Sequence, residues 1–163
     1  GTAFSVMLIR VDEYERLRKE HGEARADVAL RATRLLLGAA VRDADIVGHY
    51  ASSCFSVLLP RTPLSEALGV AERIRSGATQ CLIPTERGSL EVTMSIALAE
   101  VSDGDDVVGL CRRAESALSA AGRNRTCYHD GRSPQIVELC DKSSLATADS
   151  CAATPTASQL HCT

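Results

Sequence analysis

Two short apolar segments separated by four small or polar residues constrain the fold of this chain more than any other feature. The segments are Ile46–Tyr50 and Phe55–Leu59, and the residues between them are Ala51, Ser52, Ser53 and Cys54. Both segments contain β-branched and aromatic residues, and a separator this short is typical of an antiparallel hairpin. Arg42 and Asp45 stand just before the first segment, where a preceding helix should end. The stretch 42–60 therefore predicts a helix end followed by a β-hairpin.

Apolar runs and helix-boundary signals predict further elements on both sides of the hairpin. Asp12 and Asp27 are candidate N-caps of two helices, and Gly22 is a candidate end of the first helix. The predicted elements are a buried strand at 4–11, helices at 13–21 and 27–41, the hairpin, a helix at 64–79, a strand at 90–101, a helix at 106–121 and an edge strand at 126–129. This order, β-α-α-β-β-α-β-α-(β), predicts an α/β (α+β) domain with one sheet and helices packed against it.

The composition is that of one globular domain followed by an extension. The 163 residues are 45% hydrophobic and 24% charged, which is ordinary for a soluble protein. A formal net charge of −3 argues against binding to nucleic acid or to an anionic membrane. No apolar run is long enough to span a bilayer, and no signal peptide opens the chain. Because Ser, Ala and Thr dominate from Gly131 onward, we expect a domain at 1–130 and a poorly structured C-terminal extension at 131–163.

The seven cysteines favour reduced thiols in a cytoplasmic protein. Their number is odd, their spacings are wide, and they form no CxxC pair. A disulfide framework or a zinc site would require paired or closely spaced cysteines. We therefore expect no zinc site, and the chain as a whole is expected to hold neither another metal nor a cofactor.

Several motifs around the hairpin occur in an order and spacing that are specific in combination. They are Arg42-x-x-Asp45 before the hairpin, Phe55-x-Val-Leu-Leu-Pro within it, Ala71-Glu72-Arg73-Ile74-Arg75, Ser95-Ile96, Ala114-Glu115-x-Ala117-Leu118 and Gly122-Arg123-Asn124-Arg125. Together they resemble the GGDEF (diguanylate cyclase) family over about Phe4 to Asp130. The resemblance implies a cyclase-like fold, with a central, mainly antiparallel sheet flanked by helices.

The same resemblance implies that the catalytic groups of the family are missing. Where the family has Gly-Gly-Asp-Glu-Phe, this chain has Ala51-Ser52-Ser53-Cys54-Phe55. The family's metal-binding Asp corresponds to Arg10, and its phosphate-binding Lys falls in a deletion between Leu118 and Gly122. Hard cations need oxygen ligands, and the two glycines would let the turn adopt positive φ near a phosphate. We therefore expect a degenerate domain without cyclase activity.

The resemblance also implies that a second nucleotide site is retained. The family's product-inhibition site is an Arg-x-x-Asp motif whose Asp lies six residues before the first residue of the signature. An Arg on the third helix also contributes to it. Arg42, Asp45 and Arg73 stand at these positions. A carboxylate suits the N1–H and N2–H₂ edge of guanine, and an Arg fork suits its O6/N7 edge or a phosphate. These three residues are the predicted binding site for cyclic di-GMP.

Structural roles are the competing interpretation of the same residues. Arg42 and Asp45 could simply pair with each other at a helix C-terminus. Asp27, at one of the family's guanine-contact positions, is better interpreted as a helix cap. Cys54 is interpreted as a plain replacement rather than a reactive thiol, and His49 as a structural residue.

The function expected from these residues is that of a bacterial cytoplasmic signalling domain that binds cyclic di-GMP as a receptor. Its expected partners are this ligand, a protein partner or attached sensory or output domain, and a second copy bridged by the ligand. One alternative is a ligand-free adaptor that docks a protein partner. Another is a GTP-sensing domain that regulates an attached phosphodiesterase, which the lost metal ligand and Lys disfavour.

Overall fold

A six-stranded sheet with helices on both faces forms the domain in a computed structural model, which describes residues 3–138. The strand order is β2-β3-β1-β6-β7-β8, and a separate two-stranded hairpin is formed by β4 and β5. The strands are β1 (Phe4–Val11), β2 (Ile46–Ala51), β3 (Cys54–Pro60), β4 (Leu82–Thr85), β5 (Gly88–Glu91), β6 (Met94–Glu100), β7 (Thr126–His129) and β8 (Pro134–Ile136). The helices are α1 (Tyr14–His21), α2 (Glu23–Ala40), α3 (Leu64–Gln80) and α4 (Val107–Ala121). The predicted α+β class with a mainly antiparallel sheet is confirmed.

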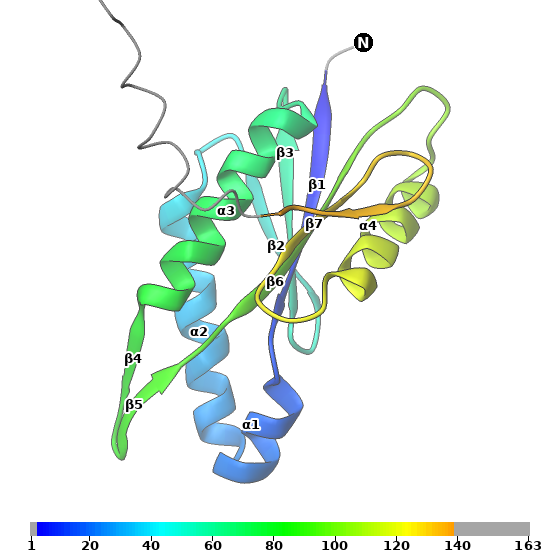
Figure 1. Cartoon of the computed structure of the whole chain (residues 1–163). Coiled ribbons are helices and arrows are strands. Elements are labelled where there is room, and N and C mark those ends of the chain that lie inside the picture. The colour runs from blue at the N-terminus through cyan, green and yellow to red at the C-terminus, as the bar shows by residue number, and fades with distance from the viewer. Residues whose placement is uncertain (1–2, 139–163) are drawn as a thin grey trace, which may run out of the picture.

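The two faces of the sheet carry two hydrophobic cores. Figure 1 shows α2 and α3 on one side of the sheet and α4 on the other. On the first side, Met7, Ile9 and Val11 of β1 belong to the core packed by α2 and α3. On the other side, Val6 and Leu8 belong to the core packed by α4. A strand covered on both faces needs apolar residues at successive positions, which explains why β1 reads as an almost unbroken apolar run.

The central strand β1 fixes the position of the hairpin. It pairs antiparallel with β3 on one side and with β6 on the other. Arg10, near its end, lies between Cys54 of β3 and Ser95 of β6 in this register. The turn of the hairpin, Ser52 and Ser53, therefore lies beside the end of β1.

The predicted strand at 90–101 is wrong, because two strands occupy it. Residues 88–91 form β5, which pairs with β4 outside the main sheet, and β6 begins only at Met94. Between them, Val92 is buried in the core on the α2–α3 side, and the Thr93 carbonyl accepts a hydrogen bond from the Asp12 amide at 3.0 Å. A continuous apolar run does not distinguish one long strand from two short strands that belong to different sheets and are joined by a bend.

The two predicted helix caps are also wrong. Helix α1 begins at Tyr14 after Glu13, whose φ of 55° is left-handed, and no side chain caps it. The Asp12 carboxylate instead bonds to residues of other segments. Helix α2 begins at Glu23, so Asp27 lies inside it rather than before it. Gly22, with φ of 84°, is the single residue between the two helices, which leaves no room for the loop that the Asp27 cap would need.

The C-terminal boundary differs from the expected one. The predicted strand at Thr126–His129 is present as β7, but it is not an edge strand, since β8 pairs with it antiparallel. The first residues of the predicted extension therefore belong to the sheet, while residues 139–163 lie outside the described part. Among residues 3–138 no helix is both long and apolar enough to cross a membrane. The four cysteines of this part, Cys54, Cys81, Cys111 and Cys127, are free thiols.

Candidate functional site

Arg42 and Asp45 form a tight turn between the end of α2 and the start of β2. The Asp45 carboxylate accepts a hydrogen bond from the Arg42 backbone amide at 2.8 Å, and the Asp45 amide donates to the Arg42 carbonyl at 3.0 Å. Asp45 therefore pairs with the backbone of Arg42 rather than with its guanidinium. That guanidinium is exposed and makes no hydrogen bond or ion pair within residues 3–138.

Arg73 reaches the same turn from α3. Its guanidinium donates a 2.7 Å hydrogen bond to the carbonyl of Ala40, the last residue of α2. Helices end with carbonyls that have no partner within the helix, and a cation there is favoured by the helix dipole. The structure thus brings all three residues of the predicted ligand site to the C-terminal end of α2. Arg73 also has a structural role there, because it caps that helix end.

The turn between β2 and β3 has no residue with positive φ. Ala51 pairs with Cys54, which leaves a two-residue loop of Ser52 and Ser53. Two-residue hairpins usually require positive φ to match the twist of their strands. Here the register shifts between His49 and Ala51, and such a bulge increases the local twist. The turn is therefore built for ordinary side chains and not around glycine.

The residue at this bulge, Tyr50, ties the hairpin to α4. Its hydroxyl donates a 2.6 Å hydrogen bond to the Glu115 carboxylate. This hydrogen bond, with smaller effects of desolvation and of the Glu115 charge, raises the pKa of Tyr50 to about 12. The contact joins positions 65 residues apart and fixes the hairpin toward the α4 side of the sheet.

Arg10 on β1 and Cys54 on β3 lie opposite each other in the sheet. The Arg10 guanidinium donates a 3.0 Å hydrogen bond to the Gly122 carbonyl. Burial raises the pKa of Cys54 to about 11, although the charge of Arg10 opposes the shift. The thiol is therefore neutral near pH 7 and is neither a good metal ligand nor a reactive nucleophile.

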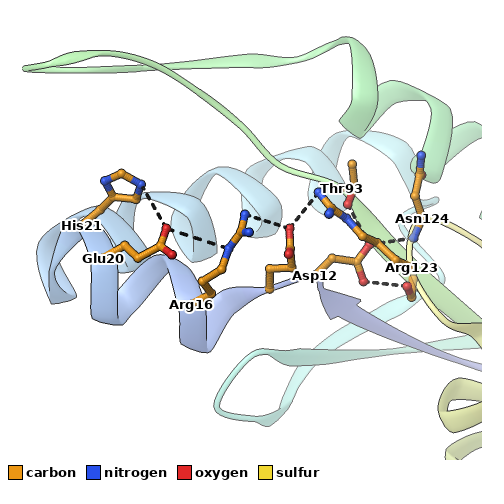
Figure 2. Close-up of polar contacts among 9 residues, drawn as sticks. Asp12, Arg16, Glu20, His21, Thr93, Arg123 and Asn124 are labelled. Atoms are coloured by element: carbon orange, nitrogen blue, oxygen red, sulfur yellow. Dashed lines mark hydrogen bonds and ion pairs between the residues drawn. The ribbon is translucent and has the colours of Figure 1, made fainter.

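The Asp12 carboxylate is used by three donors from two other segments. Ser95 and Thr93 donate hydroxyl hydrogen bonds of 2.6 and 2.8 Å, and the backbone N–H of Asn124 donates at 2.8 Å. Figure 2 shows Asp12 with Thr93 and Asn124 around it. These contacts join the end of β1 to the start of β6 and to the loop after α4. Asp12 therefore has a structural function here.

A second set of polar contacts holds the loop after α4 from the side of α3. Buried Arg75 donates to the Asn124 side chain at 2.9 Å and forms an ion pair with Glu72 at 2.9 Å. Burial alone would raise the pKa of Glu72, but the hydrogen bonds and charge of Arg75 hold it below its usual value. Residue 123 in the same loop is paired with α1, through an ion pair of 2.8 Å between Arg123 and Glu13.

From Glu13 the ion pairs continue along α1. Arg16 contacts both Glu13 and Glu20, and Glu20 lies 3.9 Å from His21. Figure 2 shows this row from His21 to Arg123. The charged groups near the end of β1 are thus mostly paired with one another.

The residues near the end of β1 do not fit the divalent metals of the family. Two or more carboxylate oxygens would be needed for Mg²⁺, whereas Arg10 is a fixed cation and the oxygens of Asp12 already accept three hydrogen bonds. Within residues 3–138 no group of three His, Cys, Asp or Glu side chains could hold a metal ion.

Comparison with known proteins identifies the class of domain. The family model described as "Diguanylate cyclase, GGDEF domain" matches residues 1–126. The chain belongs to the GGDEF domain family.

Its relatives include diguanylate cyclase DgcM of Escherichia coli K12, which is 33% identical over 125 residues, or 75% of this chain and 30% of that protein. Response regulator PleD of Caulobacter vibrioides is 33% identical over 130 residues, or 76% of this chain and 29% of PleD. The chain therefore spans about a third of the length of these curated relatives.

Solved structures confirm the fold. The GGDEF domain of DgcB from Caulobacter crescentus, in complex with c-di-GMP, superposes with a TM-score of 0.76 at 21% identity and covers 80% of both chains. The active GGEEF domain of a Vibrio cholerae diguanylate cyclase gives a TM-score of 0.73 at 23% identity, covering 78% of this chain and 83% of the other.

Sequence reasoning missed the contacts of Tyr50 and Asp12. No local feature of the sequence indicated that the Tyr50 hydroxyl would find its partner on α4. Asp12 was interpreted as a cap because it precedes a helix, although a carboxylate at a strand end can equally bond to neighbouring strands. Arg18 on α1 forms an ion pair with Glu15 at 2.8 Å.

Proposed function

We propose that this domain does not form cyclic di-GMP and instead binds it, at Arg42, Asp45 and Arg73, as a cytoplasmic receptor. The observation that carries the proposal is the hydrogen bond from Arg73 to the last carbonyl of α2. This bond places an α3 guanidinium beside the Arg42–Asp45 turn, which is the arrangement that the Arg-x-x-Asp motif needs to act as one site.

The loss of cyclase activity is supported by chemistry at the end of β1. The cyclase reaction requires metals that hold a triphosphate and activate a ribose hydroxyl. Arg10 would repel those metals, and its guanidinium bonds to the Gly122 carbonyl. Ser53 and Cys54 offer a hydroxyl and a neutral thiol where carboxylates are needed. The end of β1 therefore lacks the groups that the cyclase reaction requires.

Recognition of cyclic di-GMP is supported by the free groups of the turn. Asp45 uses one carboxylate oxygen for the Arg42 amide, and the other remains for the N1–H and N2–H₂ donors of a guanine. The exposed Arg42 guanidinium can donate to the O6/N7 edge or stack on the base. Within residues 3–138 Arg73 makes a single hydrogen bond, so its other donors remain for a phosphate.

Titration calorimetry with cyclic di-GMP tests the receptor function. Arg42→Ala removes charge-assisted hydrogen bonds worth about 1.5–3 kcal/mol, so the affinity should fall by a factor between about ten and more than a hundred. Asp45→Ala should cost a similar factor, and Arg73→Ala should also reduce the salt dependence of binding. Arg112→Ala is a matched control, because Arg112 is exposed on α4 and makes no hydrogen bond or ion pair within the described residues.

Wild-type protein without a heat of binding at tens of micromolar ligand refutes the receptor function. Equal affinity of wild type and Arg42→Ala would place the ligand elsewhere. Size-exclusion chromatography with and without the ligand then tests whether cyclic di-GMP bridges two copies, as an increase in apparent mass would indicate.

The absence of catalysis is tested by incubating the protein with GTP and either Mg²⁺ or Mn²⁺. No cyclic di-GMP above a protein-free blank is expected. Metal-dependent product would contradict the structural roles given to Arg10 and Asp12.

Adaptor function is the second candidate, and the edge of the sheet favours it. Strand β2 is an edge strand among the described strands. Ile46 and Tyr50 of β2 are 59% and 40% exposed. An open strand edge with apolar neighbours is a common docking surface for peptides. This function remains if cyclic di-GMP does not bind.

A further inference from the structure

A hollow of about 520 Å³ lies between the start of α2 and the β4–β5 hairpin. Its lining combines three nitrogen-bearing side chains, a hydroxyl and two apolar side chains: His21, Arg25, Arg87, Thr85, Val28 and Pro84. In Figure 1 this hairpin extends away from the main sheet, beside the lower half of α2. The volume is in the range of small-molecule sites, about 300–1,000 Å³.

Arg25 is the central polar group of this hollow, and its hydrogen bonding is incomplete. One terminal nitrogen donates to the Thr85 hydroxyl at 2.9 Å, and the other lies 3.3 Å from Nδ1 of His21. Its Nε is buried and has no hydrogen-bond partner within the described residues. A buried donor without an acceptor is costly and unusual in native proteins. Each terminal nitrogen uses one of its two N–H donors in these contacts, so the second donor of each is available to an anion in the hollow.

The charges around the hollow favour an anion. Arg87 is exposed and makes no ion pair within residues 3–138, so its charge remains available. Two carboxylates lie nearby: Glu86 lines the rim, and Glu20 contacts His21 but also pairs with Arg16. Two arginines that converge from different elements suit the several oxygens of a phosphate better than the two oxygens of a carboxylate.

The apolar part of the lining indicates that the ligand carries more than a phosphate. Val28 and Pro84 face the same hollow as the two arginines. Small-molecule sites typically combine such apolar walls with a few convergent polar groups. We propose that this hollow binds a small phosphomonoester, with its phosphate on Arg25 and Arg87 and its organic part against Val28 and Pro84.

This site is separate from the proposed cyclic di-GMP site. Arg25 lies in the first turn of α2, and Arg42 follows its last turn. At 1.5 Å per residue the two are about 25 Å apart along the helix. Binding in the hollow therefore does not depend on the receptor function proposed above, and either can fail alone.

Calorimetric titrations with phenyl phosphate and with inorganic phosphate, at constant ionic strength, test the proposal. Saturable binding of phenyl phosphate is expected, several times tighter than that of inorganic phosphate because of the apolar wall. Arg25→Gln should weaken it about tenfold or more, since a charge-assisted hydrogen bond is lost. Arg31→Gln is the matched control: it removes the same charge from another exposed position of α2 and should leave affinity within about twofold.

Arg87→Gln keeps the test decisive if Arg25→Gln disturbs the hairpin. Arg87 makes no hydrogen bond within the described part of the chain, so its variant should fold normally and bind phenyl phosphate more weakly.

Four results would overturn the proposal. The first is that phenyl phosphate does not bind at tens of millimolar, and the second is that Arg25→Gln and Arg31→Gln weaken its binding equally. The third is that phenyl phosphate and inorganic phosphate bind with equal affinity. The fourth is that Arg42→Ala abolishes binding while Arg25→Gln does not. The second would indicate attraction by net charge only, and the last would place the phosphate at the other site.

Discussion

Replacing Asp12 with alanine tests whether its carboxylate holds the end of β1 to its neighbours. The substitution leaves the Thr93 hydroxyl and the backbone N–H of Asn124 without their acceptor. Ser95 loses one partner but still lies 2.9 Å from the Gly122 carbonyl. A hydrogen bond to a charged group contributes about 1.5–3 kcal/mol. Because Asp12 is only half-buried and water can replace part of the loss, we expect the free energy of unfolding to fall by about 3 kcal/mol.

Urea unfolding followed by circular dichroism measures this loss. With a slope of about 1–3 kcal/mol per molar urea, a loss of about 3 kcal/mol should lower the midpoint by about 1–3 M. Asp103→Ala is the control, since Asp103 is an exposed loop carboxylate without a hydrogen bond in the described residues; it should change stability by less than about 0.5 kcal/mol. A loss below about 1 kcal/mol for Asp12→Ala would refute the structural role of the carboxylate.

Three other features can be tested by separate measurements. A chain ending at residue 130 should melt at a lower temperature than one ending at 138, because only the longer chain retains the pairing of β8 with β7; equal melting temperatures would contradict this. The pKa of Tyr50 is raised from 10.0 to about 12, so the Glu115 contact stabilises the fold below pH 10, and this contribution is lost as the pH rises toward 12. The difference between the ultraviolet titrations of wild type and Tyr50→Phe should show ionisation of Tyr50 near pH 12. Ionisation near pH 10 would disprove the hydrogen bond. Cys54 is buried, and its pKa is raised to about 11. Cys54→Ser should therefore not change the number of thiols that react quickly with a disulfide reagent at neutral pH. The loss of one fast-reacting thiol would contradict the burial of Cys54.

The sequence predicted the order of the main elements because each of them has a strong local signal. The apolar run of β1, the hairpin and the helical periodicity of α3 and α4 are all visible without tertiary information. The β4–β5 hairpin was missed since its strands have four residues each and one contains Pro84, which argues against a strand on sequence grounds. The start of α2 was misplaced because a single glycine separates it from α1.

The candidate site was predictable in its positions but not in its contacts. The spacing of Arg42 and Asp45 relative to the hairpin placed them at the end of α2, where the structure has them. The bond from Arg73 to Ala40 depends on how α3 packs against α2, and nothing in the local sequence encodes that packing. Contacts between residues as distant as Tyr50 and Glu115 require the assembled sheet and helix together.

The place of β1 in the sheet has a consequence for how the chain is made. β1 lies between β3 and β6, yet both follow it in the chain, and β6 begins only at Met94. During synthesis this apolar strand therefore has one open edge until residue 100 has left the ribosome. Pairings that span so many residues form slowly, and unpaired apolar strands on incomplete chains favour aggregation. Nascent chains that end before β6 are thus the form that chaperones and proteases should engage most strongly.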